Sequence, residues 1–330
     1  MYLATLPIDA AIGHILRHNL ADHAGHKLLS KGRRLTADNV AQLRALGIET
    51  VRVAVLEPGD VHEDEAARRL AEAVCGPGVI ATPAVHSRVN LLAEADGVVE
   101  VDAEALLAIN DVDGLTIATL ANHTLVRARQ RVATIKIIPF AVREEELARA
   151  EQTARARGSV VGLRPLRPTP VGVLLVSSPA ARGRVERGVY PAIEARVTAL
   201  GSTIVATRFV PPDERAVAAA IEDLRSVGAR LLIVAGETSI MDRDDVTPQG
   251  IRAAGGHIEH YGAPVEPGNL LLLAYLDGPG DPLPVLGAPG CVRSRDINIV
   301  DLLLPRLLAG ERVTRRDIVE LGHGGLLASR

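Results

Sequence analysis

The sequence predicts an α/β protein whose carboxyl-terminal part is a three-layer domain with a mostly parallel sheet. Apolar runs typical of buried strands alternate with helix-like segments from residue 171 onward. Such alternation indicates a largely parallel sheet covered by helices on both faces. The region before it lacks this regular alternation. We therefore expect smaller α+β and β-rich segments there.

The expected elements of the carboxyl-terminal domain follow from periodicity and from helix-ending glycines. Strands are expected at 171–176, 203–209 and 231–234, with further strands near 257–261, 270–275 and 284–286. Helices are expected at 185–200, 213–227, 249–254 and near 298–309. Gly201 and Gly228 follow the first two helices, and glycine favours a helix end because it adopts the left-handed conformation found there.

Four regions organise the chain. Residues 1–60 are expected to form a small α+β unit, and residues 61–162 a segment that is β-rich and partly helical, with helices at 64–74 and 144–156. Residues 163–170 contain Pro165, Pro168 and Pro170, which favour an extended linker. Residues 171–330 form the α/β domain.

Composition argues against several classes of protein. A formal net charge of −3 and 2% aromatic residues provide neither a basic surface nor a base-stacking platform for nucleic acid. No run of about 18 apolar residues predicts a membrane span, and the amino terminus does not resemble a signal peptide. The two cysteines, Cys75 and Cys291, lie far apart, so we expect no disulfide framework and a cytoplasmic location.

The most informative stretch is residues 236–248, GETSIMDRDDVTP. It places a turn of small residues and three acids, Asp242, Asp244 and Asp245, directly after an expected strand, where open α/β sheets bind ligands. Crowded carboxylates repel each other unless a cation neutralises them, so one hypothesis is a Mg²⁺ site for an anionic ligand. The alternative is a solvated turn in which Asp245 or Thr247 caps the next helix.

Three more loops could face the same crevice. Ser177 and Ser178 follow the first strand, and their hydroxyls suit a phosphate or a pterin edge beside a helix amino terminus. Residues 261–269 contain two prolines and two glycines, which also suit a rigid connector. In the third loop Gly290 would allow a close ligand approach. Cys291 could be a thiolate if its pKa were lowered, or a small packing residue.

The order of these motifs resembles the molybdopterin-binding domain family, which includes molybdopterin adenylyltransferase and molybdopterin molybdotransferase. The family pattern is roughly Gly-Gly-Thr-Gly followed by Asp-Val-Thr-Pro, then a Pro-Gly loop, then Gly-x-Pro-Gly. The residues that match it are Gly236, Thr238, Asp245, Val246, Thr247, Pro248, Pro267, Gly268, Gly287, Pro289 and Gly290.

The resemblance implies that the chain binds molybdopterin or its adenylate, with Mg²⁺ and with molybdate as a substrate. The cofactor-binding residues that it implies are Ser177, Ser178, Gly236, Glu237, Thr238, Ser239, Pro267, Gly268, Asn269, Gly287, Pro289, Gly290 and Cys291. Asp242 and Asp245 are the expected catalytic residues. Asp242, Asp244 and Asp245 are the expected metal ligands.

The chain departs from the family pattern at several positions. Glu237 replaces the second glycine of the first motif, and Ser239 stands at the position of its last glycine. Asn269 stands where a lysine often follows the Pro-Gly pair, and the first loop, Ser177-Ser178-Pro179, lacks the acid often found there. These departures predict little ATP-dependent adenylylation.

A wider resemblance covers nearly the whole chain. Stretches such as RVNLLAEADGVVEVDAEALLAIN, VATIKIIPFAV and LGHGGLL are similar to the amino-terminal part of bacterial molybdopterin-binding proteins, in many of which a molybdenum cofactor nucleotidyltransferase domain follows. The resemblance implies a protein of molybdenum cofactor biosynthesis or maturation, with Mg²⁺-dependent molybdate insertion. Two alternatives stay open, a non-catalytic cofactor carrier and a nucleotide pyrophosphatase. A molybdoenzyme or nucleotidyltransferase partner and a homo-oligomer are also implied.

Overall fold

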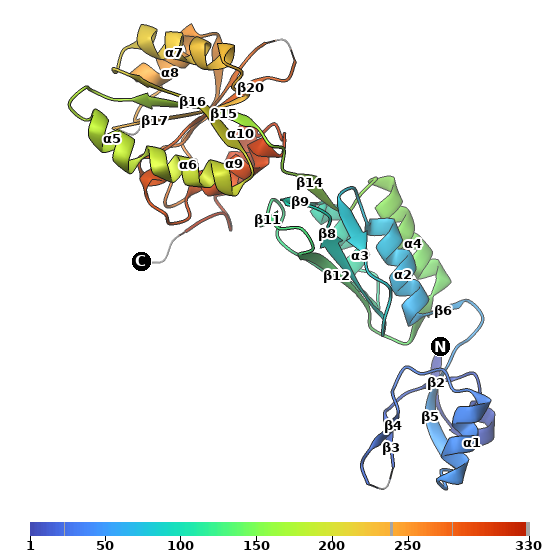
Figure 1. Ribbon diagram of the computed structural model, residues 1–330. Helices are drawn as coiled ribbons and strands as arrows, with labels where there is room; N and C mark the ends of the chain where they lie inside the picture. Colours follow the sequence, from blue (N-terminus) through green and yellow to red (C-terminus); the bar gives the residue numbers. More distant parts are fainter. Residues whose placement is uncertain (23, 238–239, 279, 328–330) are drawn as a thin grey trace. The chain divides into compact units, whose positions relative to one another are not determined.

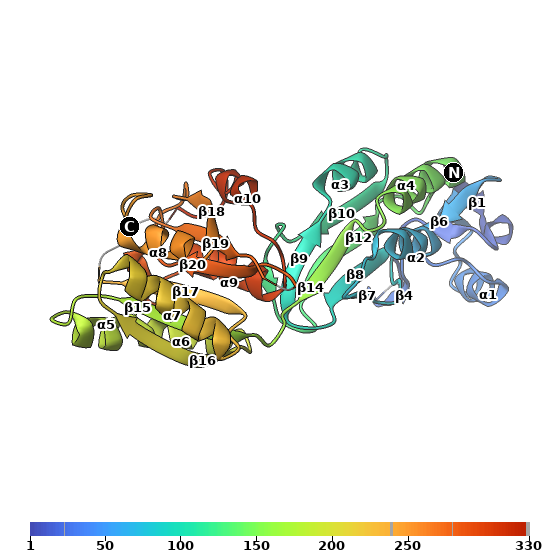
Figure 2. The same ribbon diagram turned by 90° about the horizontal axis from the view of Figure 1, so that it is seen from above.

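The computed structural model describes residues 1–22, 24–237, 240–278 and 280–327. It divides into two units, Met1–Arg164 and Pro165–Arg330, which are drawn in Figures 1 and 2. Within the described residues no helix is long and apolar enough to cross a membrane.

The first part of unit 1 is a small α+β arrangement with its own aliphatic core. β1 and β2 pair antiparallel with β5, so β5 is the central strand. Thr36 caps the start of α1 through a capping box with Asn39. The elements are β1 (Tyr2–Pro7), η1 (Ile8–Ala11), β2 (Ile15–Leu16), β3 (Leu20–Ala21), β4 (Lys27–Leu29), α1 (Ala37–Ala45) and β5 (Thr50–Val55).

The second part of unit 1 packs α2, α3 and α4 beside a four-stranded antiparallel sheet with the order β10-β12-β8-β7 (Figure 2). Arg69 on α2 donates to Glu144 at 2.7 Å and to Glu151 at 2.9 Å, which ties α2 to α4. The elements are β6 (Asp60–His62), α2 (Glu63–Val74), β7 (Val79–Ala81), β8 (Arg88–Ala93), β9 (Gly97–Val101), α3 (Ala103–Asn110), β10 (Leu115–Thr119), β11 (Leu125–Val126), β12 (Arg131–Ile137), β13 (Ala141–Arg143), α4 (Glu144–Ala156) and β14 (Val161–Pro165).

Unit 2 is built on a six-stranded sheet with the order β16-β15-β17-β20-β19-β18. The first four strands in this order are parallel, and β19 runs antiparallel to both its neighbours. The strands are β15 (Pro170–Val176), β16 (Thr203–Val210), β17 (Leu231–Gly236), β18 (Gly256–Tyr261), β19 (Leu272–Leu276) and β20 (Leu283–Gly287). This confirms the predicted mostly parallel α/β fold.

Helices cover both faces of this sheet, with α7 and α8 on one side and α5, α6 and α9 on the other (Figure 1). On the first face, Leu174 and Leu232 pack with Val217 and Ile221 of α7 in one apolar cluster. The helices are α5 (Arg182–Gly188), α6 (Tyr190–Ala199), α7 (Glu214–Ser226), α8 (Val246–Ala253), η2 (Gly290–Arg293), α9 (Ile299–Leu308) and α10 (Arg315–Glu320).

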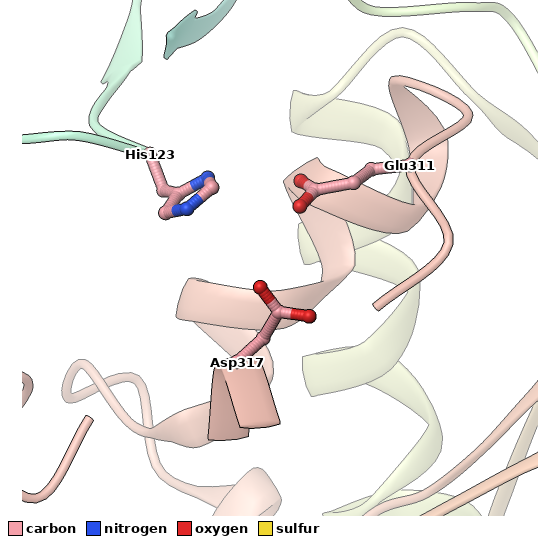
Figure 3. Close-up of side chains that lie close together, drawn as sticks. All are labelled: His123, Glu311 and Asp317. Atoms are coloured by element: carbon pink, nitrogen blue, oxygen red, sulfur yellow. The ribbon is translucent and has the colours of Figure 1, made fainter. Parts of the chain in front are cut away.

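A buried arginine joins the last two helices. Arg306 in α9 is 2% exposed, and its guanidinium donates to Glu311 at 2.9 Å and to Asp317 of α10 at 2.8 Å. Figure 3 shows these two carboxylates, on the segment after α9 and on α10. A buried charge is tolerated only when it is paired in this way. The hydrogen bonds from Arg306 to Glu311 and Asp317 therefore fix α10 against the end of α9.

Two helix predictions were wrong in detail. The helix expected over 185–200 is two helices, α5 and α6, because Pro191 stands in the first turn of α6 and has no N–H to continue α5. The helix expected to begin at Gln249 begins at Val246, since Pro248 is tolerated within a first helical turn.

The crossing of α7 and α8 provides a test of this packing. A Cβ on Gly250 would lie 2.5 Å from Cβ of Val217 and 3.0 Å from the Glu214 carbonyl oxygen. We expect Gly250→Ala to lower the free energy of unfolding by roughly 1–3 kcal/mol because it overpacks this contact. Gly188→Ala is the matched control, since nothing lies within 4 Å of its Cβ position. Equal urea midpoints for the two variants would contradict the close packing.

Candidate functional site

The register of three parallel strands brings their following loops to one edge of the sheet. Val176 at the end of β15 pairs with Gly236 at the end of β17, and Val234 of β17 pairs with Gly287 at the end of β20. The loops that begin at 177, 237 and 288 therefore start side by side. This edge is where open α/β sheets bind ligands.

A cavity of about 300 Å³ lies at this edge. Its polar lining includes Ser177, Glu237, Asp245 and Thr247, and much of the rest is apolar. No lysine or arginine is among the described residues that line it. The cavity therefore holds two carboxylates and two hydroxyls, and its volume is at the lower end for small-molecule pockets.

Asp245 stands at the N-cap position of α8, but its side chain shapes the loop in front of the helix. One oxygen of its carboxylate accepts the backbone N–H groups of Met241, at 2.6 Å, and Asp242, at 3.0 Å. Asp245 occupies the N-cap position of α8, but its side chain makes no capping hydrogen bond, and Thr247 lies inside the helix. The alternative that Asp245 is the N-cap residue is therefore confirmed in position, although its side chain makes no capping hydrogen bond, and Thr247 is not the N-cap. The first turn of α8 lines the cavity.

Asp242 and Asp244 belong to the same loop but do not occur among the described residues that line the cavity. Asp242 accepts the backbone N–H of Asp244 at 2.9 Å. Asp244 accepts from the Gln249 side chain at 3.2 Å and lies 3.9 Å from the Arg252 guanidinium. Local donors thus offset the crowding of these acids, and the charge crowding alone does not require a metal ion.

Glu237 lies between the two expected serines. Its carboxylate accepts from the hydroxyls of Ser178, at 3.0 Å, and Ser177, at 3.2 Å, and lies 3.9 Å from the Arg184 guanidinium. The hydrogen bond from Ser178, assisted by the one from Ser177, lowers the pKa of the Glu237 carboxyl below its ordinary value. Glu237 is therefore ionised at neutral pH.

The Pro-Gly loop lines a second cavity, of about 490 Å³, that includes Asn269 and, from the carboxyl-terminal segment, Leu321, Gly322 and residues 324–327. Gly268 adopts φ +135°, and a Cβ there would lie 2.6 Å from Cβ of Ile299. Pro267 follows Glu266 through a cis peptide bond. The sequence predicted one crevice for all four loops, whereas none of residues 261–269 is among the described residues that line the first cavity.

The Gly-x-Pro-Gly loop contributes Ala288 to the first cavity. A Cβ on Gly287 would lie 2.9 Å from both Ile240 and Leu272, so glycine is needed there for packing. Pro289 precedes the short helix η2, which begins at Gly290. Burial raises the pKa of the Cys291 thiol, which favours the packing role over a thiolate. Thr238 and Ser239 lie outside the described residues.

Arg196 has a structural role that its place in the sequence does not indicate. Its guanidinium donates to Asp301 at 2.8 Å and to the backbone carbonyls of Val292 and Ser294, both at 2.9 Å. It thereby joins α6 to the loop after β20. No sequence signal distinguishes it, because basic residues number 37 and all but three are arginines.

These features define unit 2 as an α/β domain with a small polar cavity at the carboxyl ends of three parallel strands. Residues 172–309 match the family model described as a probable molybdopterin binding domain, so this part of unit 2 carries a domain of that family. Residues 5–55 match a model described only as a domain of unknown function. No curated protein sequence matches the chain.

Solved structures of molybdenum and tungsten cofactor proteins are among the similar structures. The tungsten cofactor synthesizing protein MoaB from Pyrococcus furiosus is 21% identical, with 38% of this chain and 84% of that chain covered and a TM-score of 0.29. The Mog protein from Mycobacterium ulcerans is 18% identical, with 42% of this chain and 92% of that chain covered and a TM-score of 0.26. The moeA protein from Pyrococcus horikoshii is 10% identical, with 97% of this chain and 75% of that chain covered and a TM-score of 0.27.

The hydrogen bonds of Asp245 lead to a prediction for the loop. We expect Asp245→Ala to increase hydrogen–deuterium exchange at the backbone N–H groups of residues 241 and 242, because they lose their acceptor. Each lost hydrogen bond costs about 1 kcal/mol. Asp244→Ala is the control on the same loop, since its carboxylate accepts from neither of these groups. Unchanged exchange in Asp245→Ala would show that the carboxylate does not hold the loop.

Proposed function

We propose that the chain binds molybdopterin together with Mg²⁺ in the cavity at the ends of β15, β17 and β20, and that molybdate insertion takes place there. The observation that carries this proposal is that the Asp245 carboxylate accepts from the backbone N–H groups of Met241 and Asp242 and not from those of α8. The residue at the N-cap position of α8 leaves the first turn of this helix open to the cavity. A helix amino terminus attracts a phosphate through its N–H groups and its partial positive charge.

The residues of the cavity suit a phosphorylated pterin. The Ser177 hydroxyl lines the cavity and can donate to a phosphate oxygen or to the pterin edge, and the apolar lining from Val176, Ile240 and Met241 suits one face of a flat ring. Ser178 is not among the described lining residues, and its hydroxyl donates to Glu237, which lines the cavity. These groups come from the end of β15 and from the loops after β15 and β17. The match to a molybdopterin-binding family model supports the choice of ligand.

The donor set also fits Mg²⁺. Glu237 and Asp245 line the same cavity and offer carboxylate oxygens, and Mg²⁺ usually takes one or two carboxylates together with ligand phosphate oxygens. A phosphate approaching an ionised carboxylate to about 4 Å is opposed by about 4 kcal/mol per charge pair near a protein surface. When bound, Mg²⁺ would offset this repulsion. The proposed ligands are therefore Asp245 with Glu237, in place of Asp242 and Asp244.

The absence of lysine and arginine from the described cavity lining disfavours chemistry on a nucleoside triphosphate, and with it adenylylation and pyrophosphatase activity. A non-catalytic carrier is the second candidate, because the Glu237 and Asp245 carboxylates are already engaged by hydroxyl and backbone donors. A homo-oligomer, a partner enzyme and a cytoplasmic location stay predictions.

The proposal is tested by calorimetric titration of the full chain with molybdopterin in the presence of Mg²⁺. We expect Asp245→Asn to weaken binding by roughly 1–3 kcal/mol, about 5- to 150-fold, because a charged ligand oxygen is lost. Asp244→Asn removes the same charge from the same loop outside the cavity lining and should bind like the wild type. Equal affinities for wild type and Asp245→Asn would place the ligand elsewhere.

Mass spectrometry of the bound pterin separates the two candidate functions. After incubation of the complex with molybdate and Mg²⁺, molybdate insertion predicts a molybdenum-containing cofactor on the protein. The carrier alternative predicts an unchanged pterin.

A further inference from the structure

Glu237 occupies the donors that an anionic ligand would use. Its carboxylate accepts from both serine hydroxyls and lies near Arg184, whose side chain is 73% exposed. Ser177 is 1% exposed, and its hydroxyl also lies 3.1 Å from the Ser178 carbonyl oxygen. A hydroxyl has one proton to donate, so Glu237 and that carbonyl compete for it. A ligand anion would be a third competitor.

The nearest arginines on α5 do not remove this competition. Arg182 donates to Glu186 at 2.7 Å, and its guanidinium lies over the Phe209 ring at 4.6 Å from the centroid, so it is already engaged by these two side chains. Arg184 is the arginine whose guanidinium reaches the Glu237 carboxylate. The Glu237 carboxylate is thus an internal anion that already interacts with both serine hydroxyls and with the Arg184 guanidinium.

From these contacts we propose that Glu237 acts as a built-in anion that makes the cavity select a Mg²⁺-bound phosphate over a free phosphate. A free phosphate must displace the carboxylate from the Ser177 and Ser178 hydroxyls and meets its negative charge. A Mg²⁺-bound phosphate meets the same carboxylate as a metal ligand, because Mg²⁺ accepts oxygens from both partners. The inference rests on the proposed function, since it concerns the same cavity and ligand.

Glu237 is therefore a specificity residue and not a catalytic one. With its charge removed, the two hydroxyls and Arg184 become available to a phosphate without a metal ion. Glu237→Gln keeps the side-chain size and can still accept from the serines, while Glu237→Ala removes this acceptor, which leaves the Ser178 carbonyl as the competitor for the Ser177 hydroxyl. Both variants should reduce the dependence of binding on Mg²⁺, and the alanine variant should reduce it more.

The experiment titrates the full chain with molybdopterin, once in Mg²⁺ and once in EDTA. We expect the wild type to bind at least about tenfold more weakly in EDTA than in Mg²⁺. This ratio should be smaller for Glu237→Gln and smaller still for Glu237→Ala, with the remaining dependence due to Asp245, which lines the same cavity. Glu186→Gln is the matched control, because it removes a carboxylate of α5 that pairs with Arg182 and does not line the cavity. It should keep the metal dependence of the wild type.

The outcomes separate the two claims. A wild type that binds equally well in EDTA, or Glu237 variants that keep the full metal dependence, would overturn the role of Glu237 and leave the proposed ligand intact. No binding of molybdopterin by the wild type or by any variant in either buffer would overturn the proposed function itself. Circular dichroism of each variant shows that the comparison is made between folded proteins.

Discussion

The parallel pairing of β15 with β17 and of β17 with β20 is the constraint on which the candidate site depends. Parallel neighbours must end at the same edge of the sheet, so the loops after them converge although they lie far apart in the sequence. A shift of one residue in this register would move every side chain of a strand to the other face. The buried aliphatic cluster with α7 prevents such a shift.

Charged side chains then shape the converging loops from within the protein. Asp245 holds the backbone between β17 and α8, and Arg196 holds the loop after β20. Glu237 links the loop after β17 to the serines after β15. Because these contacts exist without a ligand, less conformational entropy is lost when a ligand binds. The same contacts mean that an incoming anion competes with carboxylates, which explains why a cation is part of the proposed site.

The sequence was sufficient to predict the fold of unit 2, since strands and helices alternate with clear periods and glycines follow the helices. It was sufficient to find the loop with Asp245, because three acids after a strand are conspicuous. It could not show where each carboxylate points, which depends on hydrogen bonds such as those from Met241 and Asp242. It also could not reveal Arg196, whose partners lie about 100 residues away, or that Asn269 would line a different cavity.

A crystal structure of the full chain with molybdopterin and Mg²⁺ would test the central claim most directly. Difference density for the pterin phosphate beside Ser177 and the first turn of α8, with the metal ion between Asp245 and Glu237, is the predicted result. Density in the cavity formed by Asn269, Leu321, Gly322 and residues 324–327, or in unit 1, would contradict it.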